Sequence, residues 1–250
     1  MERFTQIIES IRVSKKPTIQ FIRQSQANQS LHNLPGQCKR LGIFASSFNP
    51  ITMAHIELMR QAKEQFSLTE ILALAGMANA DKSQYDCSLE DRLLMLELAL
   101  QNTSQTSIGL SSHAFFVDML DALDTAYDSQ TELHFIVGFD TFERVLDPSD
   151  KYTKLYHRNF TDRNEALAFL LARSRFIVAG RKGAKHQEVY KLAAQLPVTL
   201  SERILYLDFP DDLAEHSATE VRLRLRQGLS IKEFVPDEVA RYIQKRGLYV

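Results

Sequence analysis

The chain has no tryptophan, only two cysteines and only nine glycines among its 250 residues. Cys38 and Cys87 form neither a CxxC pair nor a secreted disulfide framework, which favours a reducing compartment such as the cytoplasm. The seven histidines lack the spacing of zinc ligands, which argues against a structural zinc site. Because no apolar run is long enough to span a bilayer and no signal-peptide pattern opens the chain, we expect no membrane partner.

Two further absences narrow the functional class. Neither sign of charge is in excess, since 30 lysines and arginines stand against 31 aspartates and glutamates. A dedicated nucleic-acid binder is clearly basic, so we expect no nucleic-acid partner. Neither GxGxxG after the first strand nor GxxxxGK followed by Ser or Thr is present, which argues against a Rossmann dehydrogenase and a P-loop enzyme.

The first forty residues differ in charge from the rest of the chain. Between Glu9 and Glu57 no acidic residue appears, while basic ones accumulate at Arg12, Lys15, Lys16, Arg23, Lys39 and Arg40. An organellar transit segment is one interpretation. We favour the other, an amphipathic helix packed through Phe4, Ile7, Ile8 and Ile11 and followed by a piece that Pro17 interrupts. Residues 1–40 are thus predicted to be an N-terminal helical extension of a domain spanning 41–250.

From residue 41 onward, segments with strand character alternate with segments of helical spacing, which is typical of a parallel sheet with crossover helices. We expect strands at 41–46, 70–75, 106–110, 133–138, 174–180 and 203–208. Helices are expected at 54–66, 88–101, 113–127, 139–147, 160–173, 185–195, 217–227 and 236–246. The pattern predicts an α/β fold with a doubly wound, Rossmann-like parallel sheet and a helical C-terminal subdomain over 217–250. Such sheets bind ligands beyond the carboxyl ends of their strands.

The most informative stretch runs from Gly42 to His55 and joins an apolar strand, a loop of small residues and a helix start. The first N–H groups of a helix lack backbone partners and point at the ligand, so α/β proteins often bind phosphate at such a junction. Thr52 and His55 stand three residues apart there. We expect both side chains to face the same phosphate.

Three other segments follow strands or begin helices. Ser217 and Glu220 have the spacing of a capping box, while Thr219 and Arg222 of the same turn suit terminal phosphates. Gly138 and Asp140 follow an apolar strand, where the carboxylate is either an N-cap or an acceptor for a ribose hydroxyl or a magnesium shell. Basic residues after two more strands, Lys82 and Arg181, are either solvated turns or phosphate ligands.

Together these segments resemble the nicotinamide/nicotinate mononucleotide adenylyltransferases, within the nucleotidylyltransferase superfamily. Ser47 to His55 is similar to the eukaryotic-type form of the superfamily's first motif, in which threonine replaces the first of two histidines. Ser217 to Arg222 is similar to its Ser-x-Thr-x-x-Arg motif, and Gly138 to Asp140 to its strand-end GxD. The stretch 221–249 resembles the family's closing helices, and the match covers residues 41–250 in the family's order.

The resemblance implies a reaction in which the phosphate of a pyridine mononucleotide attacks the α-phosphate of ATP and pyrophosphate leaves. Catalysis is then positioning and charge stabilisation without a covalent intermediate or a general base. It implies that His55 and Thr52 hold the ATP phosphates and that Arg222, with Ser217 and Thr219, holds the β- and γ-phosphates. Mg²⁺ would be bound largely through the phosphates themselves.

The resemblance also implies the other contacts of the two substrates. The expected nucleotide-binding residues are Phe44, Ala45, Ser46, Ser47, Phe48, Gly138 and Asp140, and Tyr152 is expected to bind the acceptor. From their positions after strands alone, Arg181 is expected as a further nucleotide contact and Lys82 as an acceptor contact. Family members often stack the pyridine ring on tryptophan, so Tyr152 is expected to replace it, with Phe139 and Tyr85 as further candidates.

Several alternatives stay open from the sequence. The acceptor is nicotinamide mononucleotide, nicotinate mononucleotide or both, since an amide and a carboxylate differ by a few loop contacts. Another phosphorylated acceptor such as phosphopantetheine is a second possibility within the superfamily. A third is a nucleotide-binding protein that has lost catalysis and serves regulation or assembly. Homo-oligomerisation is also left open.

Overall fold

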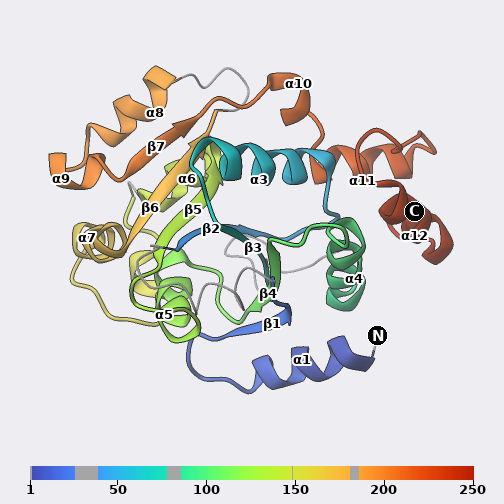
Figure 1. The fold of residues 1–250 in the computed structure, drawn as a ribbon, viewed down its shortest axis with the longest axis horizontal. Coiled ribbons are helices and arrows are strands. Elements are labelled where there is room, and N and C mark those ends of the chain that lie inside the picture. The colour runs from blue at the N-terminus through green and yellow to red at the C-terminus, as the bar shows by residue number, and fades with distance from the viewer. Residues whose placement is uncertain (1, 26–38, 78–85, 148, 181–185) are drawn as a thin grey trace.

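A seven-stranded sheet forms the centre of the molecule in the computed structural model, which describes residues 2–25, 39–77, 86–147, 149–180 and 186–250 (Figure 1). The strands lie in the order β1-β4-β3-β2-β5-β6-β7. Their bounds are β1 (Ile19–Arg23), β2 (Arg40–Ser46), β3 (Glu70–Gly76), β4 (Thr106–Ser111), β5 (Glu132–Gly138), β6 (Ser174–Ala179) and β7 (Ile204–Leu207).

The sheet is doubly wound, as the sequence predicts. Strands β2 to β7 pair in parallel, and β1 alone runs antiparallel, along β4. From β2 the chain builds outward through β3 and β4, then returns to the other side of β2 to add β5, β6 and β7. The strand order therefore reverses between β2 and β5, and a ligand crevice is expected beyond Ser46 and Gly138, the last residues of these two strands.

Helices cover both faces of the sheet and enclose two apolar clusters. One face is covered by α1 (Glu2–Arg12), α3 (Met53–Gln65), α4 (Leu89–Ala99), α11 (Ala218–Arg226) and α12 (Asp237–Arg246). The other is covered by α5 (Phe116–Ala126), α6 (Phe139–Val145), α7 (Arg163–Arg173) and α8 (His186–Ala193). Shorter pieces are η1 (Thr153–Leu155), α9 (Val198–Ser201) and α10 (Asp211–Ala214). Figure 1 shows α12 beside α4, which brings the end of the chain to the first half of the sheet.

The opening of the chain differs in part from the sequence-based prediction. The amphipathic helix is present as α1, which buries Phe4, Ile8 and Ile11 against the sheet. The piece after Pro17 is not helical, because Ile19–Arg23 forms the edge strand β1. Five residues give too short a hydrophobic pattern to identify a strand from sequence, and pairing with β4 stabilises it. Within the described residues, no helix combines the length and apolar character needed to cross a membrane.

Close packing around β2 fixes where the first loop begins. Gly42 lies at the middle of this strand, buried between β3 and β5. A Cβ atom at Gly42 would come within 2.6 Å of Leu68 Cδ1 and 2.7 Å of Ile71 Cδ1, both in the apolar core. A Cβ atom at Gly138, by contrast, would meet no atom within 4 Å.

We expect Gly42→Ala to lower the free energy of unfolding by about 1–3 kcal/mol, because two buried side chains must leave their places. Gly138→Ala is the matched control and is expected to change it by less than about 0.5 kcal/mol. Urea denaturation of both variants checks this. Equal destabilisation by the two substitutions would contradict the packing described around β2.

Candidate active site

The first loop leaves β2 at Ser46 and ends at the start of α3, beside the point where the strand order reverses. Phe48 within this loop is fully buried and has a positive φ of 44°. Its ring lies 5.8 Å from the Phe44 ring and 5.5 Å from the His55 ring, and the Phe44 and His55 rings are 5.6 Å apart, all measured between centroids. The imidazole is therefore held by two phenylalanines at the helix start.

Two hydrogen bonds between Thr52 and His55 set the orientation and tautomer of the imidazole. Thr52 is the N-cap of α3, and its Oγ1 accepts from the backbone N–H of His55 at 3.4 Å. In return, the backbone N–H of Thr52 donates to His55 Nδ1 at 3.0 Å. A neutral imidazole whose Nδ1 accepts carries its proton on Nε2. His55 thus presents an N–H donor at the start of α3, where the helix dipole also favours anions.

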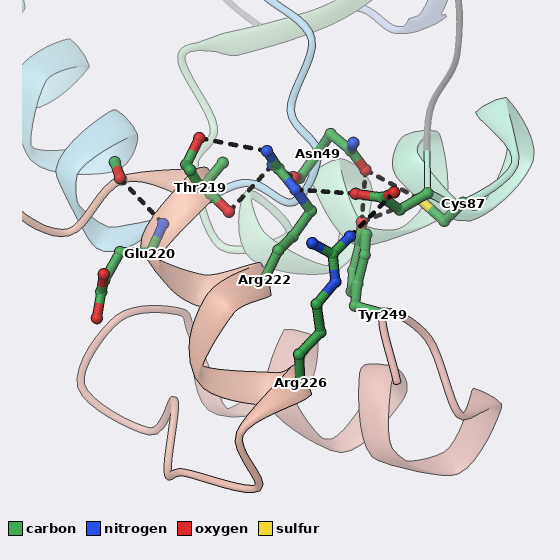
Figure 2. A network of polar contacts seen from close by, with 10 residues as sticks. Asn49, Cys87, Thr219, Glu220, Arg222, Arg226 and Tyr249 are labelled. Carbon is green, nitrogen blue, oxygen red and sulfur yellow. Dashed lines mark hydrogen bonds and ion pairs between the residues drawn. The ribbon is translucent and has the colours of Figure 1, made fainter.

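Arg222 brings the closing helices to the same loop, as Figure 2 shows. Its Nη1 donates to the backbone oxygen of Asn49 at 2.6 Å, across 173 residues of chain. The same guanidinium donates to Ala218 O at 3.1 Å and to Thr219 Oγ1 at 3.2 Å. Ser217 Oγ caps the helix by accepting from the N–H of Glu220 at 3.2 Å.

The carboxylate of Asp86 lies between two arginines of α11. Asp86 Oδ2 lies 3.0 Å from Arg222 Nε, and Asp86 Oδ1 lies 3.3 Å from Arg226 Nη2. The Arg222 side chain is only 13% exposed, whereas that of Asp86 is 40% exposed. A partly exposed carboxylate therefore pairs with a mostly buried guanidinium.

Two further hydrogen bonds hold the first loop. Arg92 of α4, almost fully buried, donates from Nη1 to the backbone oxygen of Ser47 at 2.8 Å. The N–H of Met53, in the first turn of α3, donates to the backbone oxygen of Phe234 at 2.8 Å. These two bonds hold the backbone on either side of Asn49.

Open space lies at the end of β5, next to the point where the strand order reverses. Gly138 is the N-cap of α6, and the room that its missing Cβ leaves is not filled by other protein atoms. Asp140 lies exposed in the first turn of α6. This carboxylate does not cap the helix, so the N-cap interpretation of Asp140 is wrong.

Tyr152 lies in a group of aromatic rings after β5. Its ring centroid is 5.9 Å from that of Phe115, which precedes α5. The buried Asp147 accepts from the backbone N–H groups of Lys151, Tyr152 and Thr153 at 2.8, 2.9 and 3.2 Å. These bonds hold the backbone of the half-buried Tyr152 in place.

A family model described as cytidylyltransferase-like matches residues 43–224, which include both the first loop and Arg222. The chain belongs to the cytidylyltransferase-like family. Its Rossmann-like sheet and the position of the first loop at the reversal of strand order agree with that membership.

Curated relatives extend along nearly the whole chain. A Moorella thermoacetica protein named "probable nicotinate-nucleotide adenylyltransferase" is 27% identical over 223 residues, which cover 87% of this chain and 94% of the relative. A Desulfitobacterium hafniense protein of the same name is 29% identical and covers 87% of this chain and 99% of its own. Among solved structures, Plasmodium falciparum nicotinic acid mononucleotide adenylyltransferase complexed with NaAD has a TM-score of 0.59 at 18% identity, covering 84% of this chain and 97% of that one. The structural likeness confirms the predicted fold.

The structure of this cytidylyltransferase-like chain brings several of the predicted residues together. The contacts of Thr52 and of the capping box at Ser217 differ from those predicted. Thr219 and Arg222 lie at the loop that leads to Thr52 and His55. Thr52, however, is fully buried and its hydroxyl is engaged with His55, so the expectation that both face one phosphate is wrong for Thr52. The predicted capping box at Ser217 is only half formed, because the Glu220 carboxylate pairs with Arg224 instead.

Of the other predicted residues, Phe44 to Phe48 lie at the end of β2, and Tyr152 lies beyond β5. Phe139 opens α6 and packs on the apolar cluster under it. Lys82, Tyr85 and Arg181 lie outside the described residues.

Sequence reasoning missed four residues that hold the site: Asn49, Asp86, Arg92 and Tyr249. Asn49 lies inside the first motif, but nothing in its side-chain chemistry marked it as a site residue in the sequence. Arg92 follows Glu90 and Asp91 directly, so the sequence alone gives no sign that its side chain is buried. Asp86 and Tyr249 are far from the motif in sequence, and only the fold shows that they contact it.

Proposed function

We propose that this protein transfers the adenylyl group of ATP to a pyridine mononucleotide and releases pyrophosphate. The observation that carries the proposal is the contact between Arg222 and Asn49, which places a guanidinium beside the loop and helix start that present His55. We propose that these two segments, from opposite ends of the chain, bind the phosphates of one nucleotide. The names of the curated relatives direct us to nicotinate mononucleotide as the first acceptor to consider.

The proposed chemistry is an in-line substitution at phosphorus. An oxygen of the mononucleotide's phosphate forms a bond to the α-phosphorus of ATP, while the bond from that phosphorus to the bridging oxygen of pyrophosphate breaks. The attacking oxygen is already ionised, so no base is needed, and the protein contributes positioning and charge stabilisation. His55 Nε2–H is proposed to donate to the α-phosphate, where charge builds up, near the positive end of the α3 dipole.

Arg222 is proposed to hold the β- and γ-phosphates that leave together, assisted by Thr219 and the N-terminal end of α11 with its cap Ser217. Thr52 acts on the phosphate indirectly, by keeping the proton of His55 on Nε2. Among the described residues, no group of three or more histidine, cysteine, aspartate or glutamate side chains is placed to hold a metal ion. We propose Mg²⁺ as part of the substrate, bound by phosphate oxygens and water.

The acceptor is proposed to bind across the reversal of strand order, at the end of β5. The open space at Gly138 allows close approach of a nucleotide to the backbone, and Asp140 faces solvent where it can accept from a ribose hydroxyl. Tyr152 is proposed to offer its ring to the pyridine base in place of tryptophan. Lys82 and Arg181 are proposed as further phosphate contacts from their sequence positions alone.

The test of this function is pyrophosphate release from MgATP with nicotinate mononucleotide, nicotinamide mononucleotide and phosphopantetheine supplied separately. We expect turnover with one or both pyridine mononucleotides. His55→Ala should lower kcat by about 100- to 1,000-fold, the typical effect of losing one transition-state donor, while circular dichroism stays that of the parent. Turnover only with phosphopantetheine, or with none of the three, would reject the proposal.

The ion pairs of Asp86 with Arg222 and Arg226 lead to a second prediction. Its carboxylate competes with a phosphate for Arg222 and Arg226, so Asp86→Asn is expected to lower the KM for MgATP about two- to fivefold, since such partly exposed pairs are worth up to about 1 kcal/mol. Glu238→Gln, which removes one negative charge from an exposed pair with Arg241 on α12, is the matched control. A higher KM in Asp86→Asn would instead mean that Asp86 is needed to orient Arg222.

A further inference from the structure

Both the backbone oxygen and the side-chain oxygen of Asn49 accept hydrogen bonds from residues in distant parts of the chain (Figure 2). Its backbone oxygen accepts from Arg222 Nη1 at 2.6 Å. Its side-chain Oδ1 accepts from Tyr249 OH at 2.8 Å and from Cys87 Sγ at 3.2 Å. Asn49 is 6% exposed and Tyr249 is 5% exposed, so these bonds are shielded from water.

The end of α12 directs Tyr249 to this position. Gly247 adopts a positive φ of 60°, the N–H of Leu248 donates to Ile243 O at 3.1 Å, and that of Gly247 donates to Gln244 O at 3.3 Å. This pair of bonds is the Schellman arrangement, which ends a helix and turns the chain back along it. Tyr249 itself has a φ of 68° and returns its ring to the core. The backbone therefore holds the phenol against Asn49.

Both partners of Asn49 Oδ1 are kept in their neutral, proton-bearing forms. Burial raises the pKa of the Tyr249 phenol well above its usual range, and burial raises the pKa of the Cys87 thiol as well. A buried amide oxygen that loses its donors pays the full desolvation penalty, since no water replaces them. The hydrogen bond from Tyr249 thus favours one side-chain rotamer of Asn49. In this way it also holds the residue whose backbone oxygen accepts from Arg222.

We propose that Tyr249 is a positioning residue for adenylyl transfer, acting through Asn49 on Arg222 and on the loop that leads to His55. The inference rests on the proposed function, because it assigns Arg222 to the leaving phosphates. Tyr249 touches neither substrate. It makes the correct placement of the two phosphate-binding motifs depend on the docking of the last helix.

The test compares Tyr249→Phe with Tyr242→Phe. Each substitution removes one phenol oxygen and keeps the ring, and Tyr242 OH donates to Asp91 at 2.6 Å without contacting the first loop. We expect Tyr249→Phe to raise the KM for MgATP about fivefold, the effect of one hydrogen bond worth about 1 kcal/mol, with the KM of the mononucleotide unchanged. Tyr242→Phe is expected to leave both values at those of the parent. A residue that only stabilises the fold would lower the active fraction, and hence apparent kcat, in both variants without moving either KM.

A second readout is independent of the reaction. In hydrogen–deuterium exchange, the backbone amides of residues 47–53 should exchange faster in Tyr249→Phe than in Tyr242→Phe, because only the first substitution frees the loop. Equal exchange and equal KM for MgATP in the two variants would overturn the proposal. If the parent protein releases no pyrophosphate with either pyridine mononucleotide, the proposed function fails, and the exchange comparison alone decides whether Tyr249 positions the loop.

Discussion

The hydrogen bond from Arg222 to the backbone oxygen of Asn49 is the interaction on which the site depends, because it unites two motifs that are 173 residues apart. Without it, the first loop would offer a helix N-terminus and an imidazole, and α11 would offer a separate guanidinium. With it, the Arg222 side chain lies against the loop that leads to His55. Further contacts of the loop, from Arg92, Phe234 and Tyr249, also hold it in place.

The parallel sheet explains why the two motifs meet. Its strand order puts the end of β2 at the centre of the carboxyl edge, and the closing helices return along α3 and α4 on the same face. The buried apolar clusters on the two faces fix these helices with little freedom. Preorganisation of this kind suits a reaction whose catalysis is mostly positioning and charge stabilisation.

The sequence predicts the large features well, because they rest on long periodic patterns and on motifs of fixed spacing. The six parallel strands, the helices between them and the placement of His55 at a helix start are confirmed. The short strand β1 escaped prediction because its pairing partner, not its own five residues, stabilises it. The predicted resemblance to the nicotinamide/nicotinate mononucleotide adenylyltransferases is likewise confirmed, by the family model and the curated relatives.

Contacts between distant residues were beyond the reach of sequence patterns. The spacing of Thr52 and His55 suggested a shared phosphate, but the same spacing is that of N-cap and N3, and the two residues bind each other instead. Ser217 and Glu220 show the reverse case, where a capping-box spacing gives only one of its two bonds, since Arg224 competes for the carboxylate. Local spacing limits which bonds can form, and the surrounding charges decide which ones do.

The central claim is that His55 and Arg222 meet the same triphosphate, and ¹⁵N NMR of the two side chains during one titration with MgATP tests it most directly. In the free protein, His55 Nδ1 should show the shift of an unprotonated nitrogen and Nε2 that of a protonated one. The His55 Nε2 and Arg222 Nε signals should then move together with a single midpoint, with His55→Ala and Arg222→Lys supplying the assignments. Movement of only one signal, or of neither at saturating MgATP, would contradict a shared phosphate site.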